Sequence, residues 1–175
     1  MSAEVFAIRL YVKLSLAAGQ PVPVNRPVPV GVEVRNVSPN PVWAVGVLDG
    51  SEVGLRYPYY IPHIEAPGYE LVVPEWPEMT SPLRAADFRL LTPGQAFDPT
   101  EPAHGAGYLP LVAFRDFIPS SAGRYRLSLM FSADSMRDEQ WLGSLPDPGQ
   151  DRLVHRVAKV PHCRVVSNVL IVDAC

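Results

Sequence analysis

Residues 120–131 read SSAGRYRLSLMF, and this stretch decides the fold of the chain. A short Ser-Ala-Gly segment of turn-forming residues opens it. Large apolar side chains then occupy every second position, at Tyr125, Leu127, Leu129 and Phe131. A period of two places these side chains on one face of a β-strand. The stretch therefore predicts a strand with one buried face and one outward face.

The same alternation recurs along the chain. Apolar residues hold every second position from Phe6 to Leu16, and again at Val30, Val32 and Val34. The Asp49-Gly50 pair is typical of a hairpin turn. Further strands are expected at Val42–Leu48, Val53–Tyr57, Phe88–Leu91, Leu109–Phe117 and Arg164–Val172. The chain contains 20 prolines and 12 glycines, which favours many turns and few helices.

Two segments lose the alternation. Residues 58–85 are rich in proline and aromatic residues, and residues 132–162 form a second long excursion, with a short helical turn expected near Ser135 to Leu142. A length of 175 residues suits one domain. The sequence therefore predicts an all-β fold in which a single domain, residues 1–175, is interrupted by two long irregular insertions.

A family resemblance rests on Tyr125, which follows Gly123 at a strand entry, together with Val32 and Trp43. This pattern resembles an antiparallel immunoglobulin-like β-sandwich of the kind found in bacterial proteins. The resemblance implies that the Tyr125 hydroxyl bonds to the chain just upstream, and that Trp43 packs between the sheets opposite Val32. Leu127 stands where that family has a cysteine, so the inter-sheet disulfide of the family is not expected.

Charge and cysteine content limit the partners and the compartment. The chain has 15 basic and 18 acidic residues, a balance that argues against binding to nucleic acid or to an anionic membrane. It has no stretch of 18 apolar residues and no signal-peptide pattern, so we expect no membrane span. Cys163 and Cys175 would lie about 12 residues apart along one strand, too far to bridge each other. Free thiols fit the cytoplasm.

Catalytic signatures are missing from the sequence. It contains no Gly-x-Ser-x-Gly elbow, no phosphate-binding loop and no His-Glu-x-x-His motif. We therefore expect no catalytic residues, no cofactor and no metal site. The scattered candidate ligands, which we interpret as ordinary surface or hydrogen-bonded side chains, are His63 with Glu65, His104, His155 and the adjacent His162-Cys163.

Aromatic side chains gather around the first insertion. The candidate binding residues are Tyr57, Tyr59, Tyr60, His63, Tyr69 and Trp76. Tyrosine and tryptophan dominate binding hot spots because they bring large contact area at low entropic cost. The alternative is that this loop folds back and caps the open end or edge of the sandwich, with its aromatic rings buried.

These features favour a non-enzymatic protein-interaction module, such as an accessory subunit, an inhibitor or an immunity-type protein, whose partner is another protein. A carbohydrate-binding module is one alternative, and it would need an exposed, coplanar row of aromatic rings. A metal-dependent hydrolase built on the loops is the other. The proline-rich run Pro21–Pro29 should be extended and close to a sheet edge, where it could pair with a second chain in a homodimer.

Overall fold

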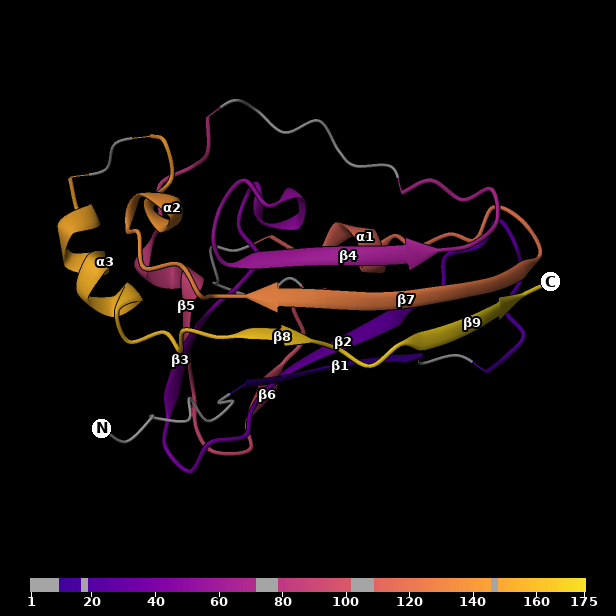
Figure 1. Cartoon of the computed structure of the whole chain (residues 1–175), viewed down its shortest axis with the longest axis horizontal. Helices are drawn as coiled ribbons and strands as arrows, with labels where there is room; N and C mark the ends of the chain where they lie inside the picture. The colour runs from indigo at the N-terminus through magenta and orange to yellow at the C-terminus, as the bar shows by residue number, and fades with distance from the viewer. Residues whose placement is uncertain (1–9, 17–18, 72–78, 102–108, 146–147) are drawn as a thin grey trace, which may run out of the picture.

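The computed structural model describes residues 10–16, 19–71, 79–101, 109–145 and 148–175, and these form antiparallel sheets with few helices (Figure 1). Sheet A contains β1 (Leu10–Leu16), β2 (Val30–Asn36) and β6 (Ala96–Phe97). Sheet C is the pair β3 (Val42–Val45) and β5 (Phe88–Leu91). Sheet B has β7 (Gly123–Ser132) at its centre, β4 (Tyr59–Glu65) on one edge, and β8 (Arg164–Val166) and β9 (Leu170–Ala174) on the other.

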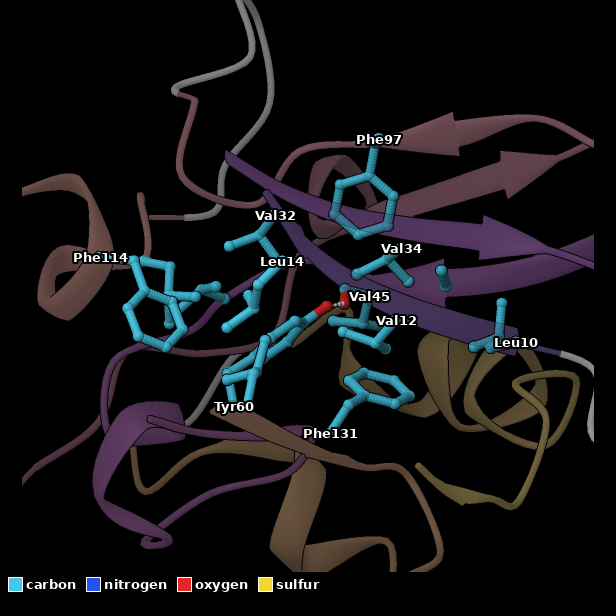
Figure 2. Close-up of a cluster of buried hydrophobic side chains, with 14 of the residues drawn as sticks. Leu10, Val12, Leu14, Val32, Val34, Val45, Tyr60, Phe97, Phe114 and Phe131 are labelled. Atoms are coloured by element: carbon cyan, nitrogen blue, oxygen red, sulfur yellow. Dashed lines mark hydrogen bonds between the residues drawn. The ribbon is translucent and has the colours of Figure 1, made fainter. Parts of the chain in front are cut away.

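The core lies between sheet A and sheet B, and alternation builds it as the sequence predicts (Figure 2). The inward side chains of β1 and β2 are fully or almost fully buried, and those of β7 meet them from the opposite sheet. The buried residues of these strands are Leu10, Val12, Leu14, Val30, Val32, Val34, Tyr125, Leu127, Leu129 and Phe131. Phe6 and Ile8, the first part of the predicted strand, lie outside the described residues.

Residues 59–65 correct the prediction of one long loop over 58–85, because they form the edge strand β4. Pro62 concealed this strand in the sequence. In register, Pro62 lies opposite Leu129, whose backbone N–H and C=O both bond to Ser167 on the other side of β7. The position opposite Leu129 therefore needs no N–H toward β7, and proline is tolerated there because β4 is an edge strand.

The predicted hairpin after Asp49-Gly50 is also wrong. The strand from Val42 ends at Val45, and a short 3₁₀ turn, Ser51–Val53, follows between two glycines with positive φ. The strand predicted over Leu109–Phe117 is replaced by the helical turn α1 (Val112–Arg115). Both differences share a cause, since the buried carboxylate of Glu52 accepts the N–H groups of Val112 and Ala113 and holds the two turns together.

The second excursion contains more helix than expected. The predicted helical turn is present as α2 (Glu139–Leu142), but α3 (Gln150–Val157) was not foreseen. The last strand is split into β8 and β9 around Ser167. Trp43 is half-buried, where it contacts Phe88 and lies under Arg156, so it does not pack between the sheets as the resemblance implied. Of the two tryptophans in the described ranges, Trp141 is the fully buried one.

The contact expected of Tyr125 is present. Its hydroxyl donates to the carbonyl of Ser121 at 3.0 Å and accepts the N–H of Ser121 at 3.1 Å, which ties the strand entry to the preceding turn.

Side chains occupy backbone groups at the edges of two strands, β1 and β9. Asn168 accepts the N–H of Leu14 and donates to its carbonyl, so β1 is capped at that point. The side-chain amide of Gln20 likewise donates to the carbonyl of Ile171 and accepts the N–H of Asp173, both in β9. Within Pro21–Pro29, the N–H groups of Val22, Val24, Asn25 and Val28 are donated inside the chain. The proline run is therefore already paired, and the structure gives no support to a homodimer through it.

Candidate interaction surface

The outward face of sheet B is built by the same alternation that builds the core. Tyr59, Ile61, His63 and Glu65 of β4 occupy the outward positions, because Tyr60 and Ile64 between them are buried. On β7 the outward positions are Arg124, Arg126, Ser128, Met130 and Ser132, of which Ser132, at the end of the strand, is fully buried. In Figure 1 this face is turned toward the viewer, and no labelled helix or strand crosses in front of β4, β7 and β9.

An apolar row crosses the middle of this face. Strand register places Ile61 beside Met130 and Met130 beside Val166, so the three side chains form one line across β4, β7 and β8. Val166 is 64% exposed. Gly54 lies against the side chain of Ile61, and the following residue, Leu55, is 65% exposed. Ile61 and Met130 are half-buried, so the exposed apolar area lies mainly at Val166 and Leu55. Neighbouring apolar side chains on a surface mark an interaction surface more often than isolated ones do.

Ion pairs lie on both sides of the apolar row. On one side Arg126 lies 3.7 Å from Glu65, which is also bonded to His63 at 2.8 Å. On the other side Arg164 lies 3.4 Å from Asp134, two residues beyond the end of β7. Exposed pairs of this kind add little stability. Their effect is to place one positive and one negative side chain on each side of the apolar row.

Two of the predicted tyrosines lie at the Asp134 end. The rings of Tyr57 and Tyr59 stack with centroids 3.8 Å apart, and the Tyr57 hydroxyl donates to Asp134 at 3.1 Å. Burial acts to raise the pKa of Asp134, but hydrogen bonds from Ser132 and Tyr57 outweigh it, so this pKa lies below its ordinary value. Burial raises the pKa of Tyr57. At neutral pH Asp134 is therefore a fixed negative charge held by two hydroxyl donors.

The remaining predicted residues divide between core and surface. Tyr60 has no exposed area and donates its hydroxyl to the carbonyl of Val45 at 2.7 Å (Figure 2). Tyr69 is half-buried against Phe117 and Tyr125. His63 is exposed on β4. Trp76 lies outside the described residues.

The capping arrangement considered as the alternative therefore applies to Tyr57 and Tyr60, which are buried, and in part to Tyr69, which is half-buried. Only Tyr59 and His63 of the described candidates present side chains at the outward face. These aromatic residues do not form an exposed row, so the described part of the chain adds no support for a carbohydrate-binding module.

Of the cysteine and histidine candidates, His104 lies outside the described residues, and the others do not gather into a cluster of ligands. Within the described ranges, no three His, Cys, Asp or Glu side chains gather as metal ligands would. Burial raises the pKa of the Cys163 thiol to about 11, so it is protonated and a poor nucleophile at neutral pH. Cys175 is exposed, and neither cysteine forms a disulfide. No helix in the described ranges has the length and apolar character needed to cross a membrane.

Sequence reasoning missed the residues at the centre of this surface. Ile61, Met130 and Val166 are single apolar residues at outward positions of their strands. The signal was present in residues 120–131, where Met130 interrupts the polar face of the pattern. Its two neighbours in the row could not be assigned because the register that joins them depends on tertiary structure.

Comparison of the chain with protein-family models, with curated proteins and with solved structures finds no match.

Proposed function

We propose that this chain is a non-enzymatic protein-interaction module, and that its contact surface is the outward face of sheet B. The observation that carries the proposal is the apolar row Ile61–Met130–Val166 on the outward face of sheet B, half-buried at Ile61 and Met130 and exposed at Val166, with ion pairs on both sides. Protein interfaces are commonly built as an apolar centre surrounded by a polar rim, with tyrosine, methionine and arginine enriched. All three residue types are present on this face.

The edges of the sheets are poorer candidates for docking. Strand addition needs a row of free backbone groups. Asn168 and Gln20 occupy such groups on β1 and β9, and Pro62 interrupts the outer edge of β4. A partner that meets the face of the sheet needs none of these groups.

We also infer that the arrangement is immunoglobulin-like. The bond from the Tyr125 hydroxyl to Ser121 supports this inference, because a tyrosine corner marks one strand entry in that family. The parallel bridge between Val22 and Ala174 adds a strand-like segment to the edge of sheet B. The half-buried position of Trp43 departs from the family pattern. The free thiols of Cys163 and Cys175 fit a reducing compartment such as the cytoplasm.

The test is a pull-down from the native host with tagged chain. Met130→Arg places a charge at the centre of the apolar row, and Val37→Arg places the same charge at an exposed position between β2 and β3. The expected result is a protein that the unmodified chain and the Val37→Arg variant retain and the Met130→Arg variant loses. Equal recovery by all three chains, or recovery of nothing by any of them, would count against the proposal.

A further inference from the structure

We propose that the partner of this face is a second copy of the same chain, packed face to face about a two-fold axis through Met130. The inference rests on the proposed function, since it uses the same surface. It comes from the order of the outward side chains along β7 and β4, which is self-complementary about the apolar row.

Along β7 and two residues past its end, every second residue reads Arg126, Ser128, Met130, Ser132 and Asp134, of which Ser132 is fully buried and the two end residues are exposed. The two ends carry opposite charges at equal distances from Met130. Charge of opposite sign at symmetric positions is what an isologous interface requires, because such an interface joins a surface to itself.

A two-fold axis along the line Ile61–Met130–Val166 brings each apolar residue against its own copy. The same rotation places Asp134 of one copy against Arg126 of the other, twice in the dimer. Both side chains are exposed enough to make this contact, with 36% and 55% of their side-chain areas accessible. Asp134 would then lie between Arg164 of its own chain and Arg126 of the second copy.

Strand β4 follows the same symmetry. The rotation sets Tyr59 opposite His63 of the second copy, and the register of β4 with β7 fixes this pairing, since Tyr59 aligns with Ser132 and His63 with Ser128. A tyrosine ring facing an imidazole is a favourable contact, and no position of β4 meets a like charge. The pattern thus holds on two neighbouring strands.

The size of the face indicates a weak dimer. β7 contains ten residues, which span about 33 Å, and three adjacent strands are about 14 Å wide. Each copy would then bury about 500 Å², and the pair about 1,000 Å², at the lower limit for a specific complex. We therefore expect association in the micromolar range and a monomer at high dilution.

The test is sedimentation equilibrium of the full chain from micromolar to millimolar concentration. The unmodified chain should dimerise reversibly. Met130→Arg should raise the dimer dissociation constant about a hundredfold or more, because two like charges meet at the axis, while Val37→Arg should not change it. Asp134→Arg and Arg126→Asp should each weaken the dimer, and the double variant should restore it, because the exchanged charges meet again.

Circular dichroism and thermal unfolding of each variant establish that the monomer is folded. A chain that stays monomeric at millimolar concentration overturns this inference, as does a dimer that Met130→Arg leaves intact. The proposed function is tested separately by the pull-down. A monomeric chain that still loses a host protein on Met130→Arg refutes the second copy and keeps the interaction surface.

Discussion

Replacing Arg56 by methionine should strongly destabilise the fold, because this side chain is 2% exposed and joins three segments of the chain. Its Nη1 donates to Asp49 at 2.7 Å and to the carbonyl of Ser81 at 2.6 Å, and its Nε donates to the carbonyl of Trp141 at 3.0 Å. Burial lowers the pKa of Arg56 even though Asp49 acts to raise it, so the charge is held at a desolvation cost.

The magnitude follows from what the substitution leaves behind. Asp49 keeps two donors, the N–H and the hydroxyl of Ser81, but loses its countercharge. The carbonyls of Ser81 and Trp141 lose their donor, at about 1 kcal/mol or more each. Breaking a buried ion pair from one side costs about 3–5 kcal/mol. We expect Arg56→Met to reduce the free energy of unfolding by that amount.

The assay is urea unfolding followed by circular dichroism, with Arg35→Met as the matched control. Arg35 pairs with Glu33 at 2.7 Å, the same distance as Arg56 and Asp49, but its side chain is 40% exposed. The control should leave stability nearly unchanged. The double variant Arg56→Met/Asp49→Asn should recover part of the lost free energy of unfolding, because Asp49→Asn removes the unpaired charge. A loss for Arg56→Met no larger than that of the control would refute the reasoning.

Three further predictions concern single positions. Gly143→Ala should lower the thermal midpoint, because Gly143 has a φ of 85° and a Cβ there would collide with the Ser81 carbonyl; an unchanged midpoint would contradict this. Tyr60→Phe should cost about 1–3 kcal/mol in urea unfolding, since the Val45 carbonyl loses a buried donor, while Tyr59→Phe should cost little. Iodoacetamide at pH 8 should modify the exposed thiol of Cys175 well before that of Cys163, whose pKa burial raises to about 11; peptide mass spectrometry would show the order.

The strands with unbroken alternation could be predicted from sequence. Residues 120–131 gave both the inward face of β7 and the hydrogen bond of Tyr125, because a period of two needs no knowledge of neighbours. The strand β2 was predicted in the same way, whereas β5 was predicted as a short strand closed by the Pro93-Gly94 turn.

The errors arose where a side chain reaches across the fold. Glu52 accepts backbone groups at Val112 and Ala113, some 60 residues away, and so replaces two predicted strands by turns. Proline is rare inside strands, so Pro62 favoured a loop in the sequence. The register places Pro62 opposite Leu129, where the strand needs no backbone N–H directed toward β7. Local patterns cannot report such contacts.

The aromatic cluster shows the same limit for function. Tyr59 and Tyr60 are adjacent in sequence and equal in chemistry, yet one lies at the outward face and the other is fully buried. The two side chains point to opposite faces because they are neighbours in the strand β4, and this strand was not predicted because of Pro62. The apolar row that replaced the cluster as the centre of the candidate surface depends on the pairing of three strands.

The most direct test of the interaction surface is site-specific photo-crosslinking in the native host. A photoreactive phenylalanine analogue at Val166, on the apolar row, should become covalently joined to a protein, either another copy of this chain or a different partner. The same analogue at Val37, also exposed but between β2 and β3, should not. No crosslinked protein at position 166, or equal crosslinking from both positions, would contradict the proposal that the outward face of sheet B is where this protein acts.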